Sequence, residues 1–191
     1  KSDFNSRLRL FFRTLYSLEA TSKIRILLQK EKPDLVHMHD IYHHISPSIL
    51  PIIKSLQIPI VQHLGDYHII SPNYHMFHDG KVCEITKPDN YYKALKHRCV
   101  KNSYSASLAE VLEKYFHRVL GWDRNLIDYF IVPSRFMKKK LIEYGINDGK
   151  IKHITHFVDS TLYNNESKLG KYILYFGRLS SEKGLEMLID A

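Results

Sequence analysis

A histidine and an aspartate mark the end of an apolar run that spans residues 58–64. His63 stands within this run, and Asp66 follows three residues later, directly before Tyr67. An imidazole and a carboxylate at this spacing suit acid–base chemistry or the orientation of a substrate. The same pair serves equally well as structural hydrogen-bonding residues, so the pattern leaves both roles open.

An earlier apolar run ends in a denser cluster. Four histidines and an aspartate fall within eight residues, at His37, His39, Asp40, His43 and His44. Alternate residues of a strand point to the same side, and zinc and related ions prefer such ligands. The cluster resembles the His-x-His-x-Asp-His signature of binuclear metal hydrolases, although Asp40 follows His39 directly and the second histidine pair is displaced. A metal-dependent hydrolase is the alternative interpretation; we expect a polar strand end at the mouth of a sheet, without a metal.

A third set of residues has the chemistry of a phosphate site. Gly177 follows the apolar run 172–176. Arg178 comes directly after it, and Lys183 follows five residues later. A glycine turn between a strand and a helix lets backbone N–H groups approach an anion. An arginine can bind two phosphate oxygens at once, and a lysine adds a point charge. The alternatives are an ordinary strand-to-helix turn with surface charges, or a non-catalytic module that binds phosphate or lipid.

A zinc site is the alternative role for the two cysteines. Cys83 and Cys99 lie near His75, His78 and His97 in the sequence. Their spacing fits no standard zinc finger, and two cysteines cannot build a disulfide framework. We therefore expect two inert thiols.

The composition is that of a globular protein with a basic balance. The 191 residues are 44% hydrophobic and 25% charged, with a formal net charge of +8. These proportions exclude a disordered or collagen-like chain, and no apolar run reaches the 18 residues of a membrane span. The basic balance favours anionic partners. The basic clusters at 93–101 and 138–140 match no nucleic-acid motif, so we expect no nucleic-acid partner.

The N-terminal residues 3–31 have helical spacing of apolar residues, with a break near Thr21 and Ser22. Arginines and lysines occupy the opposite face. Such a helix either covers a core with its basic face in solvent or lies on an anionic membrane surface. We expect the first arrangement and keep peripheral membrane contact as the alternative.

The elements that carry these residues alternate between strand and helix. We expect a doubly wound parallel α/β sheet of Rossmann-like type, followed by the first strand–helix unit of a second such domain. The near-continuous apolar character of 58–64 predicts a strand covered on both faces. The expected domains are 1–160 and 172–191, joined by a polar linker at 161–171. Strands are expected at 35–39, 58–64, 127–132, 151–154 and 172–176, helices at 46–56, 93–118 and 134–145 and from 182, and irregular structure at 65–92.

In this order the motifs resemble the retaining GT-B glycosyltransferases of glycosyltransferase family 4. The matching stretches are 33–39, 63–67 with 71–73, 132–138, 157–159, and 176–178 with 182–184. The resemblance implies two Rossmann-like domains around a cleft. It further implies transfer of a sugar, with retention, from a nucleotide-diphosphate donor to a glycan or lipid-linked acceptor. No metal cofactor is expected.

The resemblance also assigns residues to roles. Gly177, Arg178 and Lys183 fall where the family binds the donor diphosphate. Asp66 and His63 are the candidate catalytic residues, and His39 and Tyr67 the candidates on the acceptor side. Many members of this family build surface polysaccharides, which implies a cytoplasmic enzyme that works at the inner face of a membrane when the acceptor is anchored there.

Two departures from the family pattern bear on activity. Many members have a histidine directly before the residue that matches Asp66, where this chain has Gly65. His63 lies two residues earlier, on the same side of an extended strand, and we expect it to compensate. The family's first strands and most of its donor domain find no match here. We therefore expect this chain alone to be inactive and to expose apolar surface.

Overall fold

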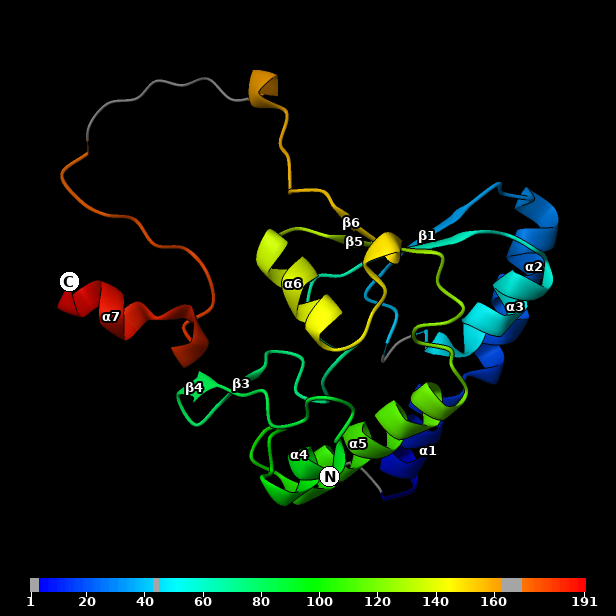
Figure 1. Ribbon diagram of the computed structural model, residues 1–191, viewed down its shortest axis with the longest axis horizontal. Coiled ribbons are helices and arrows are strands. Elements are labelled where there is room, and N and C mark those ends of the chain that lie inside the picture. Colours follow the sequence, from blue (N-terminus) through cyan, green and yellow to red (C-terminus); the bar gives the residue numbers. More distant parts are fainter. Residues whose placement is uncertain (1–3, 43–44, 163–169) are drawn as a thin grey trace.

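The computed structural model describes residues 4–42, 45–162 and 170–191 and has a parallel sheet at its centre (Figure 1). The strands of this sheet are β1 (Val36–His39), β2 (Ile60–His63), β5 (Tyr129–Val132) and β6 (Ile151–His153). A separate antiparallel hairpin joins β3 (Phe77–His78) and β4 (Lys81–Val82). The helices are α1 (Phe4–Leu15), α2 (Leu18–Glu31), α3 (Leu50–Ser55), α4 (Tyr92–Lys96), α5 (Tyr104–Val119), α6 (Arg135–Glu143) and α7 (Leu185–Asp190).

The sheet confirms the predicted Rossmann-like α/β class. Its order is β1-β2-β5-β6, and each neighbouring pair is parallel. The order follows the chain, so the described strands include no reversal of the kind that defines a doubly wound sheet. The register places His39 opposite His63, and His63 opposite Ile131. The carboxyl ends of β1 and β2 therefore meet at the same edge.

The described residues cover only one face of the sheet. Met38, Gln62, Phe130 and Ile151 are buried on the face that packs against α2, α3 and α6, where the main core lies. The other face carries exposed or half-buried side chains at His37, His39, Val61, His63, Tyr129, Ile131 and Lys152. The prediction that 58–64 is covered on both sides is thus wrong for the part of the chain that the structure describes. The expected exposed apolar surface is present, with Tyr129 45% exposed.

The N-terminal helical region is interrupted at Ser17, not near Thr21. The Ser17 hydroxyl accepts a hydrogen bond from the backbone N–H of Ala20 and so begins α2. Its own N–H donates to Ser48 Oγ, and Ser46 Oγ donates to the carbonyl of Thr14. These long-range contacts fix the break, which local spacing could not reveal. Thr21 is buried inside α2.

The region predicted as one helix at 93–118 contains two helices. Between α4 and α5 the backbone turns through left-handed residues at Arg98, Lys101 and Asn102. This turn buries Cys99 and Val100, and the Val100 N–H donates to Ser107 Oγ. Ser103 then begins α5 by accepting a hydrogen bond from Ala106. Together with Tyr91 and Val111, the Cys99 side chain forms a second, smaller core.

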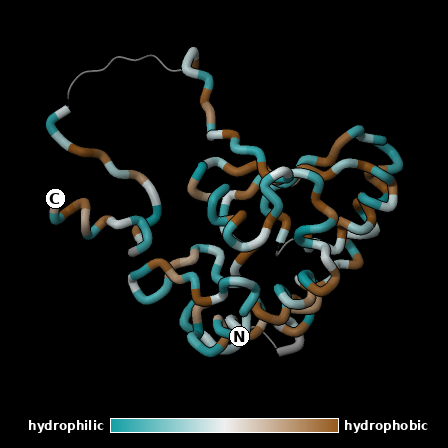
Figure 2. The backbone as a smooth tube through the Cα atoms, in the orientation of Figure 1, coloured by the Kyte–Doolittle hydropathy of each residue, from teal (hydrophilic) through white to brown (hydrophobic). Residues whose placement is uncertain are grey.

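The strand predicted at 172–176, in the C-terminal segment, is absent from the structure. Residues 172–176 form no strand, and Tyr172, Ile173 and Phe176 are 79–90% exposed. A strand forms only where neighbouring strands accept and donate its backbone hydrogen bonds, and none lies beside this segment among the described residues. Figure 2 shows its apolar stretch lying away from the sheet domain. The expected following helix is present as α7.

Candidate functional site

A pocket of about 400 Å³ opens at the carboxyl ends of β1 and β2. This is the edge at which open α/β sheets bind their ligands. The loops after the two strands and the helix α5 form its walls. Its polar lining residues are Asp40, Tyr42, Asp66, His68, Tyr74, Lys101 and Glu110.

Two carboxylates reach this pocket from neighbouring strands. Asp40 directly follows β1 and has a left-handed backbone, with φ of 41°. Asp66 follows β2, and its Oδ1 accepts a hydrogen bond of 2.9 Å from the backbone N–H of His68. A Cβ atom built on Gly65 would lie 3.6 Å from both carboxylate oxygens of Asp40. The predicted Asp66 thus lies in the pocket, together with Asp40, which the sequence connects only with the alternative metal cluster.

Behind the carboxylates lies a layer of buried polar rings. Gln62 Nε2 donates a 2.8 Å hydrogen bond to Tyr42 Oη, and the Tyr42 ring lies 4.0 Å from the His68 ring. Burial, followed by the nearby Asp66 carboxylate, raises the pKa of Tyr42 well above its usual range. Tyr42 is therefore a neutral phenol at physiological pH and holds the pocket floor in one arrangement.

The α5 side of the pocket leads into a buried ionisable cluster. His68 Nε2 lies 3.4 Å from Glu110 Oε2, and the ligand atoms of His68, Glu110 and Glu113 lie within 4.8 Å of one another. Burial, and then the charge of Glu110, raises the pKa of Glu113 to about 8. Lys114 Nζ lies 3.7 Å from Asp123 Oδ2. Sequence reasoning missed this cluster, since its helical members read only as part of an amphipathic helix.

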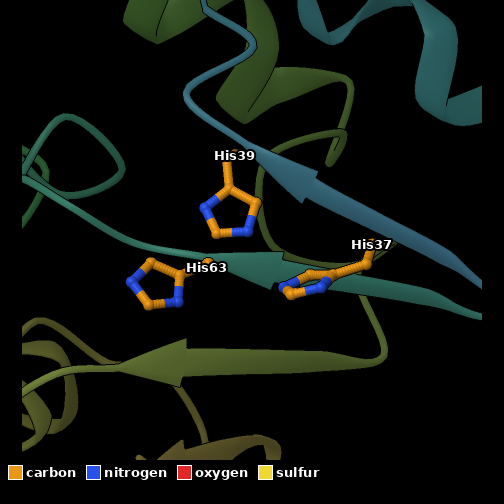
Figure 3. Close-up of side chains that lie close together, drawn as sticks. All are labelled: His37, His39 and His63. Atoms are coloured by element: carbon orange, nitrogen blue, oxygen red, sulfur yellow. The ribbon is translucent and has the colours of Figure 1, made fainter. Parts of the chain in front are cut away.

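A second cluster lies on the uncovered face of the sheet (Figure 3). The ring centroids of His37 and His39 are 4.6 Å apart, and those of His39 and His63 are 4.7 Å apart and stacked. His156 stacks on His63 at 5.6 Å. Burial lowers the pKa of His63, and the neighbouring His39, His156 and His37 lower it further.

This arrangement differs from the metal cluster of the alternative interpretation. The structure groups His37 and His39 with His63 of the neighbouring strand, whereas the Asp40 carboxylate lines the pocket. His43 and His44 lie outside the described residues. The sequence shows that His37 and His39 are alternate residues of one strand. That His63 lies next to them follows only from the register of β1 and β2.

The predicted acceptor-side residues are not in the pocket. His39 belongs to the histidine cluster, and Tyr67 lines a separate cavity of about 100 Å³ with Phe136 and Lys140. Tyr67 also packs against the main core, and burial raises its pKa. His63, predicted as catalytic, is likewise on the sheet face.

The predicted donor residues lie in the C-terminal segment. Gly177 has φ of 151°, and a Cβ there would stand 2.7 Å from Tyr175 Oη, so a side chain would force a shift. Arg178 lies 3.6 Å from Glu182, which accepts a 2.6 Å hydrogen bond from Ser180. Lys183 ends the short turn before α7. Neither these three residues nor any other described part of the segment lines the pocket at β1 and β2.

Both cysteines are free, with Cys99 buried and Cys83 half-buried. Burial, and then the neighbouring Cys83, raises the pKa of Cys99 to about 12. A thiol of this kind stays protonated, whereas metal ligation needs the thiolate. Among the described residues, the groups with metal-ligand geometry contain neither cysteine.

The comparisons with known proteins identify one family. The sequence profile described as Glycosyltransferase Family 4 matches residues 5–162, which include the sheet, the pocket and the histidine cluster. No curated protein and no solved structure matches the chain. Within the described ranges, no helix combines the length and apolar character needed to cross a membrane.

Proposed function

Because the chain belongs to Glycosyltransferase Family 4, we propose that it supplies the acceptor-binding domain of a retaining GT-B enzyme. Its donor is a nucleotide-diphosphate sugar and its acceptor a glycan or a lipid-linked sugar. The observation that carries the proposal is the pocket at the ends of β1 and β2, which lies within the matched residues and is lined by Asp40 and Asp66.

The acceptor binds in this pocket. Sugar hydroxyls are hydrogen-bond donors, and the two carboxylates are strong acceptors for them. Lys101 and Tyr74, which also line the pocket, offer further polar groups. Asp66 orients the reacting hydroxyl toward the anomeric carbon of the donor. The rigid Tyr42–Gln62 pair behind it keeps the pocket open in one shape.

The donor diphosphate binds to Arg178 and Lys183. In the reaction the bond between the anomeric carbon and the diphosphate oxygen breaks, and the acceptor oxygen forms the new bond on the same face of the sugar. The acceptor proton passes to the departing diphosphate. Negative charge grows on that diphosphate, so two cations and the N–H groups after Gly177 lower the barrier without a metal.

Nucleotide binding tests the proposal. The full-length protein is titrated calorimetrically with UDP and with GDP, and so are Arg178→Ala and Lys183→Ala. Lys139→Ala, which removes an exposed lysine on α6, is the matched control. We expect one nucleotide to bind and both donor-site variants to lose that binding, with the control unchanged. Absence of binding by either nucleotide, or equal binding by all variants, would contradict the proposal.

A further inference from the structure

We propose that His37, His39 and His63 form a Zn²⁺ site on the uncovered face of the sheet. The inference does not rest on the proposed function, since none of these residues lines the acceptor pocket. It rests on the strand register, the positions of the three imidazoles and the accessibility of the face on which they lie.

The register brings the donors together. His37 and His39 are alternate residues of β1 and so point to the same face, and His63 is the register partner of His39 on β2. The three ring nitrogens that could ligate an ion lie within 4.8 Å of one another. In a tetrahedral zinc site with Zn–N bonds of about 2.05 Å, ligand nitrogens are about 3.3 Å apart. Side-chain rotation spans the difference, because the backbone already places all three rings (Figure 3).

The donor set selects the metal. Three imidazoles with one open position are typical of catalytic zinc sites, and the open position takes water. The cluster contains no thiolate, which disfavours Cu(I) and iron–sulfur clusters, and no carboxylate, which disfavours Mg²⁺ and Ca²⁺. The nearest carboxylate in sequence, Asp40, lines the acceptor pocket with Asp66.

The position of the site, at the ends of β1 and β2, indicates a structural role for the ion. β1 and β2 end in His39 and His63, and the residues that follow carry Asp40 and Asp66 into the pocket. An ion bound to both strand ends ties the two pocket loops to each other. His37 and His39 are exposed, so an ion reaches them directly from solvent.

Metal titration of the full-length, metal-depleted protein tests the proposal. We expect Zn²⁺ to bind with one ion per chain, and Co²⁺ to give the intense visible absorption of a tetrahedral site. His63→Gln and His37→Gln should each weaken binding by more than about tenfold, since even the loss of an outer partner of a metal ligand costs 10–100-fold. His153→Gln is the matched control, because His153 lies on the same sheet at β6 but outside the cluster.

A thermal readout keeps the test independent of activity. Zn²⁺ should raise the melting temperature of the wild type and of His153→Gln through preferential binding to the folded state. It should not raise that of His37→Gln, whose exposed position tolerates substitution without loss of the fold. No saturable binding, or equal affinity in His37→Gln and His153→Gln, would overturn the site.

Discussion

Gly65 faces the Asp40 carboxylate across the ends of β1 and β2: a Cβ atom built on Gly65 would stand 3.6 Å from each oxygen of that carboxylate. This is an ordinary van der Waals distance, and Gly65 is not among the residues with positive φ. Neither space nor backbone conformation therefore requires a glycine here. From the sequence resemblance we expect family members with a histidine at this position to place its imidazole next to this carboxylate.

Gly65→His should fold and place a charged imidazole in the pocket. We expect the melting temperature to fall by less than about 4 °C, which corresponds to roughly 1 kcal/mol in a chain of this size. The Asp40 carboxylate favours the imidazolium, so NMR titration should give the new imidazole a pKa above about 6.5. Adding Asp40→Asn should lower that pKa again. A collapse of stability in Gly65→Ala, the smallest test of the space, would contradict this account of the contact.

Asp66→Asn should abolish most sugar transfer without disturbing the fold. An asparagine keeps the side-chain oxygen that accepts the His68 N–H, so the turn after β2 is retained. It loses the charge that orients the acceptor, and we expect turnover to fall by about 100-fold or more. Release of UDP or GDP from a panel of nucleotide sugars by the full-length protein measures this.

Nucleotide affinity separates this effect from a general loss of structure. In Asp66→Asn it should stay at the wild-type value, because Arg178 and Lys183 bind the donor. Asp34→Asn, an exposed aspartate just before β1, is the matched control and should retain full turnover. Wild-type turnover in Asp66→Asn would remove Asp66 from the acceptor site.

Asp89 should contribute more to stability than any surface aspartate. Its Oδ1 accepts a 2.7 Å hydrogen bond from Arg124, and its Oδ2 accepts two from Arg118. Arg124 is 7% exposed, so Asp89→Ala leaves a buried cation without its carboxylate. We expect a loss of about 3 kcal/mol in the free energy of unfolding, measured by urea denaturation.

Asp79→Ala controls for the strain that alanine experiences at a left-handed backbone position. Both aspartates have left-handed φ, 57° at Asp89 and 49° at Asp79, so alanine is strained to a similar degree at both. The Asp79 side chain is 75% exposed and contacts His78. The difference between the two variants thus measures the contacts of the Asp89 carboxylate with Arg118, Arg124 and the Tyr91 hydroxyl, which donates a 2.8 Å hydrogen bond to Oδ1. Equal losses would show that backbone strain accounts for the whole effect.

Local signals predicted much of this fold. Ser134 was expected to begin a helix, and its hydroxyl accepts from Met137 as an N-cap. The four strands of the sheet fall within their predicted ranges because apolar runs between turns are strong signals. What failed depended on distant partners. The break at Ser17 is fixed by Ser46 and Ser48, and residues 172–176 have no neighbouring strand to pair with.

In the candidate site, too, features set by local sequence were predictable and features set by distant partners were not. Asp66 was predicted from its place after an apolar run and does line the pocket. The grouping of His63 with His37 and His39 needs the β1–β2 register, which the sequence alone leaves undetermined. The Glu110–Glu113 cluster needs the packing of α5 against the pocket. Residue types were thus predictable, whereas the partners of each residue were not.

The exposed apolar side chains of α1 favour contact with an anionic membrane surface, the alternative interpretation of residues 3–31. Leu10 and Phe12 of α1 are 61% and 57% exposed, and Arg9 and Arg13 lie beside them in sequence. Apolar side chains flanked by arginines suit the headgroup region of an acidic bilayer. We expect the wild type to sediment with phosphatidylglycerol vesicles, and the double variant Leu10→Ser with Phe12→Ser to stay in the supernatant.

A substitution of another exposed apolar residue controls for non-specific hydrophobic adsorption to the vesicles. Val119, at the end of α5, is 83% exposed. Val119→Ser should sediment as the wild type does, and added salt should weaken wild-type binding because the arginines contribute by charge. Equal sedimentation of all three proteins would assign α1 to another interface.

Glu113 should make stability depend on pH. Its carboxyl has a pKa of about 8 in the folded protein, raised from 4.5 by burial and then by Glu110. Between these two values the folded state holds a proton that the unfolded state has lost, so this group's contribution to stability falls as pH rises. Lys114 and His117, which neighbour Glu113, titrate with lowered pKa values and act in the opposite direction.

The variant Glu113→Gln isolates this contribution from its neighbours. Its free energy of unfolding minus that of the wild type should rise between about pH 5 and pH 8, with a limiting slope of about 1.4 kcal/mol per pH unit. Urea denaturation at intervals across this range measures the difference. Glu143→Gln is the matched control: hydrogen bonds from Lys140, and then from Lys87, lower the pKa of Glu143, so its difference from wild type should stay flat over the same range. A flat difference for Glu113→Gln would mean that Glu113 is ionised in the folded protein and that Lys114 balances its charge.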